Sequence, residues 1–195
     1  DDVRLYDYVL TSSEISRMAD LSTPGDLNSD KQIDFRDFSV LGSFWMSVPH
    51  VSIVEISNLT VYDGLLWNVK GNLQSGDARY TDRAYTFSSV PPPFLGARWI
   101  QSANDSADSY AVNPMTEFTV RADADVYVTW DDRVSPASWL STWTDTGYNV
   151  TDSDTGSGNF SLYRKTFSAG STVTLGPVEH TTGVSMYNVI VLPAQ

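Results

Sequence analysis

Short runs of β-branched and aromatic residues, each followed by turn-forming residues, fill the chain from residue 51 to residue 195. Apolar and polar residues alternate within these runs, most clearly at 118–120 and 126–130. A period of two is that of a half-buried strand. Many short strands separated by Gly- and Pro-containing turns predict a mainly β protein, an antiparallel, jelly-roll-like β-sandwich. We expect strands at residues 51–56, 65–71, 83–90, 97–103, 116–122, 125–131, 159–167, 171–176 and 186–193.

The interior of this sandwich follows from the same alternation. Every second side chain of a half-buried strand faces the core, where large apolar side chains stabilise the fold most. Tyr127 and Thr129 are expected on the face opposite to that of their apolar neighbours. The predicted interior consists of Trp67, Trp99, Phe118, Val126, Val128, Trp130, Leu162, Val189 and Val191.

The stretch "GDLNSDKQIDFRDF", residues 25–38, carries an acidic or amide side chain at nearly every second position. So many negative charges would repel one another unless a cation lay between them. Counted from the first Asp, positions one, three, five, seven, nine and twelve are those at which an EF-hand loop binds Ca²⁺, and position seven binds through its backbone carbonyl. The predicted calcium ligands are Asp26, Asn28, Asp30, Gln32, Asp34 and Asp37.

Two positions differ from a standard EF-hand loop. Lys31 stands at position six, where Gly is usual, and Asp37 stands at position twelve in place of Glu. An Asp there, followed by an amphipathic helix, resembles a dockerin-type calcium loop. Only one repeat is visible, whereas dockerins that bind cohesins carry two, so we expect a structural calcium site and not a cohesin partner. The alternative is a solvated acidic turn before the helix.

Composition restricts the partners and the compartment. The net charge of −12 and the pI near 4.3 argue against nucleic acid, which needs a basic face. The sequence has no apolar run of the length that a membrane helix needs. It has no cysteine, so disulfides do not stabilise it. An acidic chain with a calcium loop suits a secreted, extracellular or cell-surface bacterial protein, because the Ca²⁺ outside the cell is about millimolar and fills even a weak site.

The first 22 residues contain a predicted strand, "VRLYDYVL" at 3–10, followed by a short helix. Thr11 and Glu14 form a capping-box pattern at the start of that helix. This segment resembles the last strand and exit helix of a laminin-G-like, concanavalin-type jelly roll. The resemblance implies a strand separated from its own sheet, which would pair elsewhere in the chain or with a neighbouring copy.

Breaks at "STPGD" and "SVPH" divide the chain into residues 1–22, the calcium segment 23–47 and the β-sandwich 51–195. The sandwich resembles C-terminal modules of bacterial polysaccharide lyases and related secreted carbohydrate-active enzymes. The residues that carry this resemblance are 80–91, 124–147, 160–176 and 185–193.

No catalytic residue is predicted. The two histidines, His50 and His180, lie in turn-like contexts without a nucleophile motif or metal-ligand spacing. Asp131 and Asp132 are adjacent, so on a strand they point to opposite faces and cannot both flank one glycosidic bond. Asp82 could supply the second carboxylate if its loop met theirs.

Glycan binding has better candidates. The motifs "YTDR" and "WDDR" each combine an aromatic ring, an acid and an arginine. Aromatic rings stack on sugars, and an arginine can bind a uronate carboxylate through two hydrogen bonds. The alternative is that Asp82 pairs with Arg83, and Asp132 with Arg133, in ion pairs that hold the loops in place. The predicted ligand-binding residues are Tyr80, Asp82, Arg83, Asp132, Arg133, Trp139 and Trp143.

Two functions follow from these features. The first is a non-catalytic, calcium-stabilised accessory region of an extracellular polysaccharide-active protein, with an acidic polysaccharide as its partner. The second is a structural subunit of an extracellular fibre or surface layer, assembled when the N-terminal strand completes the sheet of a neighbour.

Overall fold

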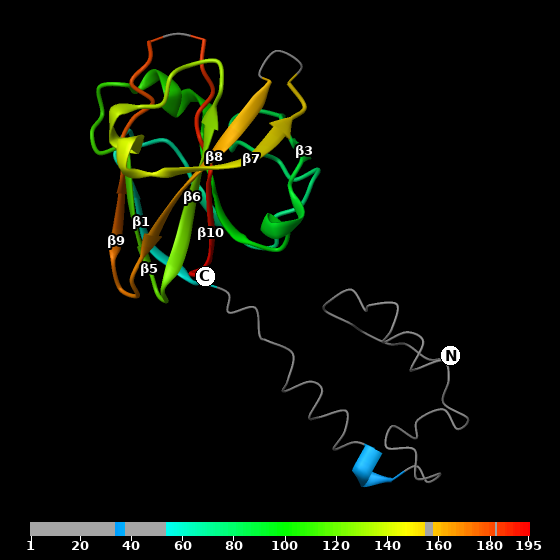
Figure 1. The fold of residues 1–195 in the computed structure, drawn as a ribbon. Coiled ribbons are helices and arrows are strands. Elements are labelled where there is room, and N and C mark those ends of the chain that lie inside the picture. Colours follow the sequence, from blue (N-terminus) through cyan, green and yellow to red (C-terminus); the bar gives the residue numbers. More distant parts are fainter. Residues whose placement is uncertain (1–33, 38–53, 155–157, 182) are drawn as a thin grey trace. The chain divides into compact units, whose positions relative to one another are not determined.

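A computed structural model of the chain describes residues 34–37, 54–154, 158–181 and 183–195 (Figure 1). The chain divides into two units, Asp1–His50 and Val51–Gln195. In the first unit the described residues are 34–37, of which 35–37 are helical. The predicted strand at 3–10, the helix after it and the first four predicted calcium ligands lie outside the described residues.

The second unit consists of two sheets, and Figure 1 shows the strands of the smaller one side by side. The smaller sheet joins β1 (Ile56–Val61), β5 (Thr116–Val120) and β9 (Thr172–Leu175) in the order β1-β5-β9. The larger has the order β2-β4-β10-β6-β8-β7-β3. Its strands are β2 (Asn68–Lys70), β3 (Phe87–Ser89), β4 (Arg98–Gln101), β6 (Ala124–Asp131), β7 (Thr144–Asp152), β8 (Asn159–Phe167) and β10 (Val189–Pro193).

Helix is scarce in the described part of this unit. It is confined to three 3-10 turns, η1 (Pro92–Phe94), η2 (Asn104–Asp108) and η3 (Ser138–Thr142). None of the helices in the described residues has the length and apolar character needed to cross a membrane. The prediction of a mainly β, antiparallel sandwich is confirmed.

The directions of the strands decide which loops meet. Each strand of the larger sheet runs antiparallel to its neighbours, so β4 and β6, on either side of β10, run the same way. The C-terminal ends of β4 and β6 and the start of β10 therefore lie together along one edge of this sheet, the edge formed by strand ends. Several predicted ligand-binding residues follow these strand ends.

The inner face of the larger sheet packs against the smaller sheet. Val126, Val128 and Val189 of the larger sheet are fully buried in one apolar cluster with Phe118 and Val173 of the smaller sheet. These residues alternate along their strands, as the sequence predicts. This cluster is the core between the two sheets.

The outer face of the larger sheet is buried as well. A second apolar cluster contains Trp99 and Leu162 of the sheet together with Leu73 and Phe94 from the connection between β2 and β4. The parts of this connection on either side of the edge strand β3 thus cover this face, and all of β6 is buried as a result. Trp99 and Leu162 are interior residues, as predicted, but they lie on the opposite face of the sheet from the inter-sheet core.

A fully buried arginine, Arg79, connects strands on this outer face. Its Nη1 lies 2.8 Å from Oδ2 of Asp152, and its Nε donates to Oδ1 of Asn188 at 2.7 Å. Its guanidinium stacks 3.3 Å from the ring centroid of Phe160. Since a buried charge requires a charged or hydrogen-bonding partner, this arginine holds β7, β8 and the residues before β10 together.

Two strands differ from the prediction. The sequence predicts no strand between residues 131 and 159, whereas the structure has β7 there; Gly147 has φ 73°, and the register against β8 shifts between Asp145 and Asn149. A bulge accommodates the glycine while pairing continues on both sides. β1 occupies 56–61 and not the predicted 51–56, of which residues 51–53 lie outside the described residues.

Candidate functional site

Asp82 fixes its loop to the start of η2. Its Oδ1 accepts the N–H of Asn104 at 2.7 Å, and its Oδ2 accepts that of Asp105 at 2.9 Å. These are amides that the short helix cannot satisfy itself. Arg83 forms ion pairs with Asp105 and, at 3.7 Å, with Asp82. The side chain of Arg83 is 40% exposed, so a paired guanidinium reaches the solvent here.

Arg133 pairs with Asp131, whereas the sequence suggests Asp132 as its partner. Its Nε lies 2.9 Å from Oδ1 and 3.1 Å from Oδ2 of Asp131. Asp132 instead accepts the N–H of Ser161 at 3.1 Å. Successive residues of a strand point to opposite sides, so only one of these two acids can reach the guanidinium from the end of β6.

The Asp131–Arg133 pair is held in its charged form. Burial alone would raise the pKa of Asp131, but hydrogen bonds from Arg133 and from the backbone of Ser185 outweigh burial and lower that pKa. The hydrogen bond with Asp131 in turn raises the pKa of Arg133. The catalytic acid of a glycoside hydrolase needs a raised pKa, which Asp131 does not have.

The two loops are linked through the residues before β10. Asn104 accepts the N–H of Met186 through Oδ1 at 3.2 Å. The neighbouring Ser185 donates its N–H to Oδ2 of Asp131 at 2.8 Å, and its Oγ accepts from Nη2 of Arg133 at 3.0 Å. The structure therefore brings the "YTDR" and "WDDR" loops to one edge of the larger sheet. We term Asp82, Arg83, Asp131, Asp132 and Arg133 the arginine edge.

Tyr80 does not present its ring to a ligand. It is 2% exposed, and its hydroxyl donates to the carbonyl of Met186 at 2.9 Å. Burial raises the pKa of this hydroxyl well above its ordinary value. Tyr80 therefore supports the "YTDR" loop from the protein interior and does not form a stacking face for a sugar.

Trp139 and Trp143 belong to the packing of the inner face. Trp139 donates its Nε1–H to the carbonyl of Pro177 at 2.8 Å and makes edge contacts with Trp130 and Trp143. Both side chains are partly buried against the inter-sheet core. Asp131 and Arg133, by contrast, extend from the outer face, because Asp131 is paired with Phe160 of the outer cluster.

Two predicted calcium ligands, Asp34 and Asp37, are described. Asp34 accepts the N–H of Arg36 through Oδ1 at 2.7 Å, and Oδ2 of Asp37 accepts the N–H of Asp34 at 2.8 Å. This reciprocal arrangement caps the start of the helix. The part of the chain that the structure describes contains no group of three or more His, Cys, Asp or Glu side chains that could hold a metal ion. The calcium site therefore stays a prediction.

Three residues of the linked loops were not indicated by the sequence: Asn104, Asp105 and Ser185. Their contacts depend on the order of strands in the larger sheet, and no local motif carries that order. The one available signal is positional, since polar residues follow the ends of β4 and β6.

No protein-family model matches the chain, and no curated protein sequence matches it. Among solved structures, a β-glucuronidase from glycoside hydrolase family 2 aligns with a TM-score of 0.63 at 18% identity, over 71% of this chain and 15% of that one. A family 138 glycoside hydrolase that targets pectin rhamnogalacturonan II aligns with a TM-score of 0.48 at 10% identity, over 74% of this chain and 17% of that one. The chain thus spans less than a fifth of either enzyme, and the first alignment shows a shared β-sandwich fold.

Proposed function

We propose that the chain is a non-catalytic, extracellular accessory region of a bacterial polysaccharide-active protein, and that its β-sandwich binds glycan. The observation that carries the proposal is the fold likeness to a segment that makes up 15% of a β-glucuronidase. A match of that size corresponds to one module of a larger enzyme. Because a fold can serve many functions, a binding experiment has to test the proposal.

The chemistry of the arginine edge supports the non-catalytic part of this proposal. Both carboxylate oxygens of Asp82 accept backbone amides, and Asp131 is paired with Arg133 and has a lowered pKa. The lowered pKa of Asp131 is the opposite of what the protonated acid in glycosidic cleavage requires, and both oxygens of Asp82 are already engaged by backbone amides. Both serve to hold the loops.

The same edge supplies the candidate contacts to an acidic glycan. The side chains of Arg83 and Arg133 are 40% and 35% exposed, and each is oriented by a carboxylate. A uronate would have to share these guanidinium groups with the protein's own acids, so we propose a weak contact. Asp132 holds its loop by accepting the N–H of Ser161, and Tyr80 holds the loop of Arg83 by donating from its hydroxyl to the carbonyl of Met186. Trp139 and Trp143 pack against the inner-face core.

We also propose that Ca²⁺ stabilises residues 23–47. Asp26, Asn28, Asp30, Asp34 and Asp37 would supply side-chain oxygens, and Gln32 its carbonyl oxygen. Hard oxygen ligands of this kind are those that Ca²⁺ prefers. The ion would balance the charge of the loop.

Affinity electrophoresis of the full chain in gels that contain neutral or uronate-rich polysaccharides tests glycan binding. We expect retardation in at least one gel. The double variant Arg83→Gln/Arg133→Gln should lose retardation in the uronate gel, with Arg121→Gln, in the turn at the opposite end of β6, as the matched control. Migration unaffected by every polysaccharide would refute the proposal, and concentration-dependent polymerisation in its place would favour the fibre subunit.

Hydrogen exchange with and without EDTA tests the calcium proposal. Chelation should speed the exchange of amides in residues 23–47 and leave those of β6 and β10 protected, because the sandwich has its own core. Equal exchange of 23–47 in both conditions would show that the segment is a solvated acidic turn.

A further inference from the structure

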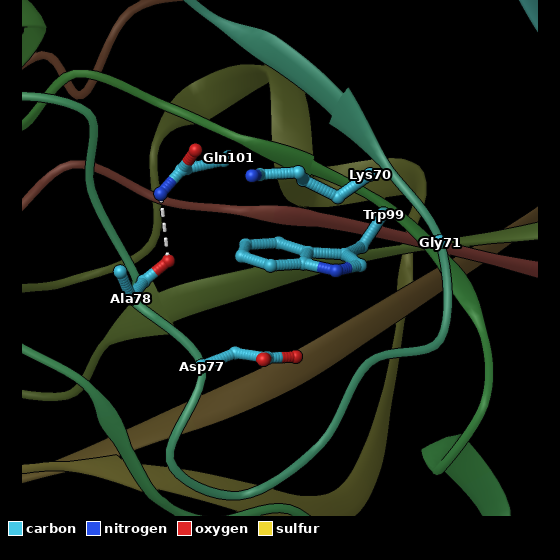
Figure 2. A pocket seen from close by; sticks show the side chains of 6 residues that line it. All are labelled: Lys70, Gly71, Asp77, Ala78, Trp99 and Gln101. Atoms are coloured by element: carbon cyan, nitrogen blue, oxygen red, sulfur yellow. Dashed lines mark hydrogen bonds between the residues drawn. The ribbon is translucent and has the colours of Figure 1, made fainter.

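A pocket lies on the outer face of the larger sheet, beside the edge strand β2 and its neighbour β4 (Figure 2). Its volume is about 130 Å³. A protein cavity of about 150 Å³ holds a benzene molecule, so this pocket is on the scale of one six-membered ring. Its lining residues are Lys70, Gly71, Asp77, Ala78, Trp99 and Gln101.

The indole of Trp99 supplies an unused hydrogen-bond donor to this pocket. Trp99 is 2% exposed, and its Nε1–H has no hydrogen-bond partner in the structure. Figure 2 shows the nitrogen-bearing edge of the ring on the side of Gly71 and Asp77. Buried polar groups nearly always have a partner, and leaving one without costs about 1–3 kcal/mol. An acceptor bound at the inner end of the pocket would remove that penalty.

Two opposite charges flank the indole. Figure 2 shows the ring between the side chains of Lys70 and Asp77. Asp77 accepts the N–H of Gln74 through Oδ2 at 2.8 Å, which orients the carboxylate and leaves it further acceptor capacity. No ion pair joins Lys70 to an acid among the described residues. The pocket therefore offers a cationic donor and an anionic acceptor at once.

The walls of the pocket are built before any ligand arrives. Gln101 donates from Nε2 to the carbonyls of Ala78 and Tyr80, at 2.8 and 3.1 Å. These bonds fix the segment that returns past β4, and the first of them is drawn in Figure 2. A preformed wall lowers the entropy that a ligand has to overcome on binding.

We propose that this pocket binds one neutral pyranose unit of a polysaccharide, an inference that rests on the proposed glycan-binding function. A pair of sugar hydroxyls both donates and accepts, so one can donate to Asp77 while accepting from Trp99 and Lys70. A uronate carboxylate only accepts, and Asp77 repels it. The pocket thus favours a neutral sugar, unlike the arginine edge.

The indole N–H of Trp99 provides a direct test by NMR. The full chain has six tryptophans, and the indole cross-peak that disappears in Trp99→Phe belongs to Trp99. We would titrate the methyl pyranosides of glucose, galactose, mannose and glucuronic acid. The Trp99 peak should shift with at least one neutral sugar and much less with the glucuronide.

Variants at the pocket give the second readout. Lys70→Met and Asp77→Asn should each weaken the binding of that neutral sugar by about tenfold, the effect of losing a hydrogen bond to a charged group. Lys165→Met on β8 is the matched control.

The outcomes separate this inference from the proposed function. Two results would refute the binding of a neutral sugar in the pocket and still leave glycan binding by the chain in place. In the first, the Trp99 peak shifts with the glucuronide alone. In the second, it shifts with no sugar although polysaccharide still retards the chain. In the latter case the pocket holds water only. A chain that no polysaccharide retards would remove the proposed function itself.

Discussion

The two faces of the larger sheet are buried by different means. Its inner face carries apolar residues such as Val126, Val128 and Val189, which meet the apolar side chains of the smaller sheet. Its outer face is covered by residues 71–97, and there the buried set includes Arg79 with its ion pair to Asp152. Apolar burial is non-directional, whereas an ion pair depends on geometry and on both partners being present. Removing a buried polar group from the outer face should therefore lower the free energy of unfolding more than removing an apolar group of similar size from the inner face.

The largest expected effect is that of Arg79→Met, which keeps the apolar stem and removes the guanidinium. Asp152 and Asn188 then lose a buried partner. Removing one member of a buried ion pair costs about 3–5 kcal/mol, and the lost hydrogen bond adds about 1–3 kcal/mol. Urea denaturation measures the change in the free energy of unfolding.

Asp152→Asn is the milder companion of that variant, for use if Arg79→Met does not fold. In the double variant Arg79→Met/Asp152→Asn, part of the stability should return, because the uncompensated charge is gone. A loss below about 1 kcal/mol for Arg79→Met, as for an exposed pair, would mean that the outer face is held by apolar contacts alone.

Phe118→Ala tests the inner face. Phe118 is fully buried between the sheets, so its truncation leaves a cavity and should cost about 3–5 kcal/mol. Tyr110→Ala, at a tyrosine that is 47% exposed, is the matched control and should change stability little. A loss below about 1 kcal/mol would contradict the placement of Phe118 in a tightly packed core between the two sheets.

Asp131→Asn tests the ion pair at the edge of the outer face through its pH dependence. The pKa of Asp131 is lowered in the folded state, so the pair stabilises the fold above the unfolded pKa of about 3.9, and this contribution is lost as pH falls through the folded pKa. The free energy of unfolding of the wild-type chain should exceed that of the variant by about 1–3 kcal/mol at pH 7, and this difference should shrink below pH 4. A difference independent of pH would assign the effect to packing.

Arg83→Met should give the smallest effect. Its ion pairs with Asp82 and Asp105 are exposed, and exposed pairs contribute little to stability. The melting temperature should stay essentially unchanged, in contrast to Arg79→Met. A marked fall in melting temperature would show that Arg83, like Arg79, contributes to the stability of the fold.

Much of the fold could be predicted from the sequence. Alternation identified the β-sandwich and the burial of residues such as Phe118 and Val128, because the period of a strand is a local property. The polar, glycine-containing β7 was missed, since its pairing with β8 and β3 comes from neighbours and not from its own pattern. Trp99 and Leu162 were correctly predicted to be buried, but the sequence did not indicate that they lie in a second core on the outer face, because that depends on the connection between β2 and β4 folding back over the sheet.

Local sequence patterns were enough to identify the acids and arginines of "YTDR" and "WDDR" as candidate ligand-binding residues, and to suggest calcium from the spacing of the acidic loop. The acid that pairs with each arginine depends on the packed fold, in which Arg133 pairs with Asp131. Arg79 and Asn188 lie 109 positions apart, and only the order of the strands places them in contact. A local pattern depends on residues a few positions apart, whereas the partners of a buried charge depend on how all the strands pack together.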